Sequence, residues 1–160
     1  IEKVTELLIK LEPGFLPFPV FTEIARLVTV ATIEVVVFFK EPDSDLLKIQ
    51  LLQRPADDKW WPSQWHVSGS ILRSTDTKGS FMDAFNRIEE ESGCTFSREP
   101  IHFRNHFRQE QRGATIAIQH YSIISEKSKI GTFYNLNELP ENIVAEHKNL
   151  IDLAVKTLES

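Results

Sequence analysis

The sequence predicts an α+β fold, because stretches with the period of strands and stretches with the period of helices both occur along one chain of 160 residues. β-Branched and aromatic residues dominate residues 27–39, and polar and apolar residues alternate over residues 101–108. Apolar residues recur at helical spacing over residues 81–88 and again over residues 143–158. The length suits a single domain over residues 1–160, in which we expect residues 1–26 to form a helix and an extended arm and residues 27–160 to form the core.

The N-terminal region predicts a short amphipathic helix over residues 2–11, which Pro13-Gly14 ends. The apolar segment 15–21 that follows contains prolines at positions 17 and 19. Such a composition is typical of an extended arm that packs over a core or across a subunit interface.

Residues 27–39 and 46–54 predict a β-hairpin with a turn at residues 41–45. No apolar run approaches the roughly 20 residues that a membrane-spanning helix needs, so we expect no membrane partner. Tryptophans follow at positions 60, 61 and 65, where core or lid packing is favoured over stacking on a base or sugar. For His66, a hydrogen-bonded structural role is favoured over that of a general base.

Chemistry is expected in the region from Trp60 to Phe96. A short strand over residues 65–70 runs into a tight turn, a polar loop covers residues 73–80, and a helix runs from residue 81 until Gly93 ends it. The core-facing stripe of this helix comprises Phe81, Ala84, Phe85 and Ile88, and a second face carries Asp83, Arg87, Glu90 and Glu91. Because Mg²⁺ prefers oxygen ligands, this second face predicts a metal site. The alternative is a solvated surface, in which Arg87 pairs with acidic residues one turn away.

The alternation over residues 101–108 predicts a strand whose polar face carries His102, Arg104, His106 and Arg108. Such a row either neutralises a diphosphate or faces solvent. Residues 114–124 predict the partner strand of a hairpin, residues 132–136 a short strand, and residues from 139 onward the last helix. His147 falls near the buried stripe of that helix, where packing is the favoured role over that of a distal base.

Charge and cysteine content narrow the function further. A net charge of -5 and a pI near 5.6 argue against broad nucleic-acid binding and leave small anionic substrates open. The lone Cys94 can form no internal disulfide, which favours a reducing, cytoplasmic location. We expect Cys94 to be a small buried apolar residue.

Residues 86–94 resemble the end of the Nudix hydrolase signature, with its E-E-x-G element at Glu90, Glu91 and Gly93. Val67-Ser68-Gly69-Ser70 stands where that family commonly has F-P-G-G, and Asp76 is the candidate for the early glutamate of the signature. Arg87 stands where the family usually has a glutamate. The flanking segments 51–55 and 133–140 also resemble the family, so the resemblance covers about residues 33–155. Among the branches of the family, that of the GDP-mannose mannosyl hydrolases is the most similar.

The resemblance implies an α/β/α sandwich with a mixed sheet between the signature helix and the C-terminal helix. It also implies Mg²⁺- or Mn²⁺-dependent hydrolysis of a nucleoside diphosphate linked to another moiety, such as a sugar. The metal would be held by Gly69, Glu90 and Glu91, and the catalytic residues would be Glu90, Glu91 and Asp83, the last as a substitute base. The substrate would be bound by Arg54, Trp65, Arg73 and Arg104.

The alternative is a Nudix-fold module that has lost catalysis and binds a nucleotide or a protein, with the guanidinium of Arg87 in the metal's place. Isomerase chemistry on a diphosphate ester is a third reading. The expected partner is a small diphosphate molecule and not a nucleic acid, and a homodimer could form through the N-terminal arm.

Overall fold

The computed structural model describes residues 1–14, 16–42, 44 and 46–160. Its helices are α1 (Glu2–Leu8), α2 (Phe18–Leu27), α3 (Met82–Ser92) and α4 (Ala145–Leu158). Its strands are β1 (Val30–Lys40), β2 (Leu47–Gln53), β3 (Trp65–His66), β4 (Ser68–Ile71), β5 (Ile101–Glu110), β6 (Gly113–Ile124) and β7 (Thr132–Asn135).

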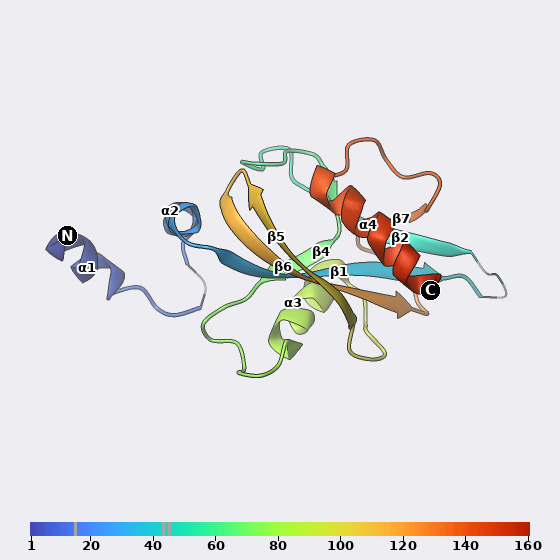
Figure 1. Ribbon diagram of the computed structural model, residues 1–160, viewed down its shortest axis with the longest axis horizontal. Coiled ribbons are helices and arrows are strands. Elements are labelled where there is room, and N and C mark those ends of the chain that lie inside the picture. The colour runs from blue at the N-terminus through green and yellow to red at the C-terminus, as the bar shows by residue number, and fades with distance from the viewer. Residues whose placement is uncertain (15, 43, 45) are drawn as a thin grey trace.

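The strands form one mixed sheet in the order β3-β2-β1-β6-β5, with β4 paired to β1 and β7 paired to β2. The pair β1 and β6 is parallel, and the other pairs are antiparallel. The helices α3 and α4 cover the sheet (Figure 1), and each packs against its own cluster of buried side chains. The predicted α/β/α sandwich is therefore confirmed.

The central strand β1 is buried on both faces because its apolar residues serve two cores. Ile33, Val35 and Val37 pack with Ala84, Phe85 and Ile88 of α3, so the predicted stripe of that helix is confirmed. The intervening Val36 and Phe38 pack instead with residues of α4. The alternation follows from the two-residue period of a strand, and it places Glu34 on the α4 side of the sheet.

The second helix corrects the predicted extended arm. Pro17 is its N-cap and Pro19 lies in its first turn, where the missing N–H has no intrahelical partner to lose. Prolines at those positions therefore start a helix over residues 18–27 and do not prevent one. Residue 15 of the predicted arm, and residues 43 and 45 of the predicted turn, lie outside the described part of the chain.

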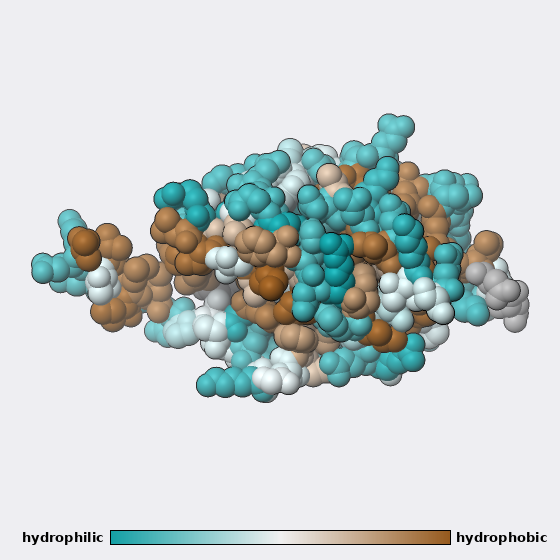
Figure 2. Space-filling view, viewed as in Figure 1, coloured by the Kyte–Doolittle hydropathy of each residue, from teal (hydrophilic) through white to brown (hydrophobic). Residues whose placement is uncertain are grey.

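The first helix lies at one end of the molecule (Figure 1), and its apolar side chains are exposed (Figure 2). The predicted helix is confirmed in a shorter form that ends at Leu8. None of the helices within the described residues is long and apolar enough to cross a membrane.

The segment 65–71 also differs from the prediction. Instead of ending in a tight turn near residue 70, it continues as β4 alongside β1, and Gly69 lies opposite Glu34. A Cβ at position 69 would lie 3.1 Å from the carbonyl oxygen of Ile33, so glycine lets the two strands approach closely.

Candidate functional site

A cleft of about 60 Å³ opens on the α4 side of the sheet, where β1, β4 and the β5–β6 hairpin meet the loop that follows β2. Three guanidinium groups, from Arg54, Arg108 and Arg112, line it against the two carboxylates of Glu34 and Glu110. The lining therefore carries an excess of positive charge, which suits an anionic ligand.

The floor of the cleft is formed by Glu34, whose side chain is only 5% exposed. Its carboxylate accepts hydrogen bonds from both terminal nitrogens of Arg108, one of them 3.1 Å long, and from Nε2 of Gln119 at 3.1 Å. Burial alone would raise the pKa of Glu34, but the partners His147 and Arg108 outweigh it and hold that pKa well below its usual range. Glu34 is therefore an ionised carboxylate at neutral pH.

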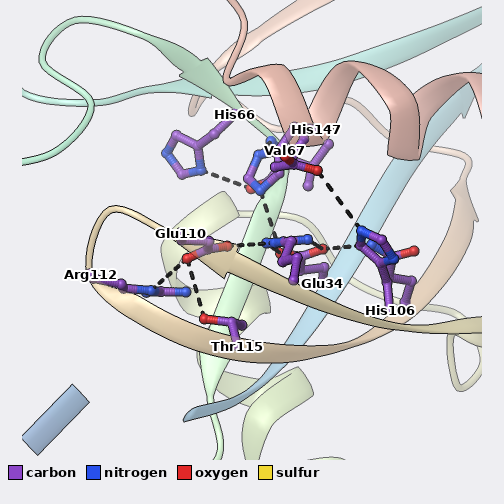
Figure 3. A network of polar contacts seen from close by, with 11 residues as sticks. Glu34, His66, Val67, His106, Glu110, Arg112, Thr115 and His147 are labelled. Carbon is purple, nitrogen blue, oxygen red and sulfur yellow. Dashed lines mark hydrogen bonds and ion pairs between the residues drawn. The ribbon is translucent and has the colours of Figure 1, made fainter. Parts of the chain in front are cut away.

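A second buried carboxylate holds the arginines of the hairpin in place. Glu110 accepts a hydrogen bond from Nε of Arg108 at 2.6 Å, one from Nε of Arg112 at 2.8 Å and one from the hydroxyl of Thr115 at 3.3 Å. The resulting network runs from Arg112 through Glu110 to Glu34 and on to His147 (Figure 3). This network holds Arg112, at the rim of the cleft, through the buried carboxylate of Glu110.

Two histidines close the cleft toward α4. The Nδ1 of His147 accepts the N–H of Val67 at 3.2 Å, which leaves its proton on Nε2, 3.5 Å from Glu34. The Nδ1 of His66 lies 2.8 Å from the carbonyl oxygen of Val67, to which it donates. Burial, with a smaller effect from the charge of Arg54, lowers the pKa of His66 to about 3, so His66 is neutral at physiological pH.

The rim of the cleft carries Trp61 between two cations. The guanidinium carbons of Arg54 and Arg112 lie 5.5 Å and 5.6 Å from the centroid of its ring. Asp58 fixes the loop, because its Oδ1 accepts the N–H groups of Trp60 and Trp61 at 2.9 Å and 2.8 Å. Cation–π contacts with Trp61 therefore hold both guanidinium groups at the mouth of the cleft. Arg112 is also bound by Glu110, and Arg54 by Asp58.

Arg87 does not make the pairs with Asp83 and Glu91 that helical spacing suggested. Its terminal nitrogens donate to the two carboxylate oxygens of Asp76 at 2.7 Å and 2.8 Å, and its Nε donates to the hydroxyl of Ser70 at 2.9 Å. One terminal nitrogen also donates to the carbonyl oxygen of Ile71 at 3.0 Å. The hydrogen bonds to Asp76 raise the pKa of Arg87 and, reciprocally, lower that of Asp76.

The metal site predicted at Gly69, Glu90 and Glu91 stays a prediction. Glu90 and Glu91 are exposed on α3, and Asp83 accepts the N–H of Thr77 at 2.6 Å. Within the described residues, no group of three His, Cys, Asp or Glu side chains is placed to hold a metal ion. The guanidinium of Arg87 lies between α3 and β4.

The structure brings together two of the other predicted site residues, since Arg54 and Gly69 both line the cleft. Trp65 packs edge-on against Tyr134, with ring centroids 5.4 Å apart, and it also lines an open pocket beside the cleft together with Arg54 and Glu91. Arg104 lies outside the cleft, in a groove between β5 and α4. Arg73 lies on the loop that Asp76 caps, where its N–H donates to Asp76 at 2.9 Å.

The predicted basic row on β5 is split by an irregularity between His102 and Arg104. His102 therefore contacts His120 on the α3 side of the sheet, with ring centroids 5.3 Å apart, whereas Arg104 lies opposite Gln119. A bulge moves every later residue to the other face, which periodicity alone does not reveal.

Sequence reasoning missed Glu34, Glu110 and Arg112 as site residues. A signal for Glu34 was present, because it is the one charged residue within residues 27–39. The alternation of Arg108, Glu110 and Arg112 across the hairpin was a second signal.

No family model and no curated protein matches the sequence. Solved structures do match. A MutT/nudix family protein from Listeria innocua is 19% identical with a TM-score of 0.67, over 81% of this chain and 94% of that chain. The NUDIX domain of Shewanella oneidensis NrtR, solved with ADP ribose, is 17% identical with a TM-score of 0.63, over 96% and 97%. The Ap4A hydrolase of C. elegans is 14% identical with a TM-score of 0.62, over 82% and 99%.

These neighbours leave some predictions untested. The whole NrtR protein, of which the alignment covers 61%, has been solved with a 27mer DNA, so the absence of nucleic-acid binding in this chain stays a prediction. The similarity to one branch of the family and the cytoplasmic location also stay predictions. What the likeness does establish is the architecture, and this chain has the Nudix fold.

Proposed function

We propose that the chain binds a nucleoside diphosphate derivative in the cleft, with guanidinium groups and not a metal ion compensating the phosphate charge. The observation that carries this proposal is the placement of Arg54 and Arg112 beside Trp61 at the mouth, with guanidinium carbons 5.5 Å and 5.6 Å from the ring centroid. Guanidinium groups bind phosphate oxygens in a bidentate manner, so two of them at one mouth suit a diphosphate.

Buried polar atoms support a polar ligand at this place. Within the described residues, Nε of Arg54 and the hydroxyl of Thr32 are buried without a hydrogen-bond partner, and both residues line the cleft. Buried polar groups are normally paired, so a bound molecule or water is expected to complete them. The ligand class includes ADP ribose, with which the NrtR domain was solved, and the nucleotide sugars that the sequence suggested.

Hydrolysis of this ligand is the second candidate, and one observation favours it. Glu91 lines an open pocket beside the cleft together with Arg54 and His66. Surrounding protein atoms raise the pKa of the Glu91 carboxyl, while the charge of Arg54 opposes the rise. A carboxylate of raised pKa beside a phosphate-binding arginine is an arrangement suited to general-base attack by water.

Isothermal titration with ADP ribose, GDP-mannose and ADP, in EDTA, tests the binding proposal. Because a charge-assisted hydrogen bond contributes about 1.5–3 kcal/mol, Arg54→Ala and Arg112→Ala should each weaken binding by roughly tenfold to a hundredfold. Arg98→Ala, at an exposed position outside the cleft, is the matched control and should bind like the native chain. Unchanged affinity in both cleft variants, or no binding of any of the three ligands, would contradict the proposal.

The same ligands incubated with Mg²⁺ or Mn²⁺, and separately with EDTA, test turnover by release of phosphate or sugar. If the second candidate holds, Glu91→Gln abolishes the release but leaves the far-UV circular dichroism and the ligand affinity unchanged. Binding without release would leave the chain as a binding module.

A further inference from the structure

The guanidinium of Arg87 occupies a crossing point of three segments. It starts from α3, reaches the outer edge of β4 through Ser70 and Ile71, and grips Asp76 in the connecting loop with two parallel hydrogen bonds. Its side chain is 19% exposed and that of Asp76 is 10% exposed, so the pair is largely screened from water. An arginine fork bound to a carboxylate in this way fixes both position and orientation.

Three carboxylates act on the charge of this guanidinium. The carboxylates of Asp76, Asp83 and Glu90 all act on its charge and raise its pKa, with Asp76 contributing most. Asp83 is itself tied to the loop, because it accepts the N–H of Thr77. The direct carboxylate partner of the guanidinium is Asp76, and Asp83 and Glu90 act on it through their charge alone.

We infer that Arg87 is a built-in cation that organises the loop of residues 72–80 against α3 and β4, so that the native chain needs no divalent ion for this purpose. The inference concerns the chain's own architecture and does not depend on which molecule the cleft binds. A converse expectation follows. Without the guanidinium, the charges of Asp76, Asp83 and Glu90 are uncompensated, and an added divalent ion can partly neutralise them.

The test compares thermal unfolding of the native chain, Arg87→Ala, Arg87→Lys and the control Arg98→Ala in EDTA and in 10 mM Mn²⁺, with ionic strength matched by KCl. The melting temperature of the native chain and of Arg98→Ala should differ by less than about 1 °C between the two conditions. Arg87→Ala should melt about 5 °C lower than the native chain in EDTA and regain a large part of that loss in Mn²⁺. Arg87→Lys keeps the charge but loses the fork, so it should melt below the native chain and stay insensitive to Mn²⁺.

Trypsin cleavage after the exposed Lys78 gives a local readout, since that residue lies within the loop. Cleavage there should become at least tenfold faster in Arg87→Ala under EDTA and slow again in Mn²⁺, with no change in Arg98→Ala. Stabilisation of the native chain by Mn²⁺ would overturn the inference. So would an Arg87→Ala variant that melts like the native chain, that Mn²⁺ does not restore, or that Arg87→Lys matches in its response to Mn²⁺.

Discussion

Glu34 connects more parts of the cleft than any other described residue that lines it. Its carboxylate contacts Arg108 of β5, Gln119 of β6 and His147 of α4. A buried ion pair contributes little net stability when it forms, but removing one partner strands the other charge in a medium of low polarity. The carboxylate of Glu34 therefore holds the buried guanidinium of Arg108, and through it the hairpin that carries Arg112.

Glu34→Gln should lower the free energy of unfolding by about 3 kcal/mol, because it keeps the shape of the side chain and removes the charge that Arg108 needs. Urea unfolding at pH 7 measures the change. Glu23→Gln is the matched control, since Glu23 pairs with Arg26 at 3.2 Å on the exposed face of α2, and it should cost less than about 0.5 kcal/mol. Equal losses in the two variants would show that the buried pair is not what holds the site.

For single residues, the sequence indicated which residue types to expect at the site, but it did not indicate which other residues they contact. Arg54 and Gly69, both predicted as site residues, line one cleft, although their predicted roles stay predictions, and the burial of Cys94 and His147 was also expected. The predicted partners of Arg87 were wrong. Helical spacing identifies neighbours only within one helix, whereas Asp76 lies in a loop eleven residues earlier in the chain.

Among the elements, α3 shows how far periodicity reaches. Its apolar stripe fixed the face that packs on β1, and Gly93 ends it in the left-handed conformation at φ 64°. By contrast, the sequence did not predict α2, because its prolines were interpreted as helix-breaking residues. Proline is nevertheless compatible with the first turn of a helix.

The glycine that ends α3 yields a comparison with Gly79, which also has positive φ, at 78°. Alanine at either position meets the same backbone strain of roughly 1–2 kcal/mol. A Cβ at position 93 would in addition lie 2.5 Å from Oγ of Ser128 and 2.9 Å from Cδ1 of Ile130, whereas at position 79 nothing lies within 4 Å. Gly93→Ala should therefore cost at least about 1 kcal/mol more than Gly79→Ala in urea unfolding. Equal losses of unfolding free energy would show that backbone strain alone sets the cost, and that the loop at residues 128–130 moves aside without destabilising the fold.

For the whole molecule, the order of the sheet was beyond what the sequence alone could supply. Hairpins follow from local turns, and the β1–β2 and β5–β6 pairs were expected. The parallel pair of β1 and β6 joins residues more than 80 positions apart, and periodicity says nothing about such partners. The resemblance to the Nudix signature implied a mixed sheet, which the structure confirms, but it did not identify this pair of strands.

The same architecture lowers the pKa of two of its buried histidines, His66 and His120, and this makes the stability of the whole molecule depend on pH. Burial is the main cause that lowers the pKa of His66 to about 3 and that of His120 to about 4, from an ordinary value of 6.5. Below pH 6.5 the unfolded chain binds protons that the folded chain does not, so stability is complete above that pH and falls as the pH drops.

Each histidine should cost about 1.4 kcal/mol of unfolding free energy between pH 7.5 and pH 5.5, because one pKa unit corresponds to that amount. Urea unfolding of the native chain should therefore show a loss of about 3 kcal/mol over this interval, and His120→Gln should show about half of it. A native chain whose unfolding free energy stays constant between these pH values would mean that neither histidine is kept neutral by the fold.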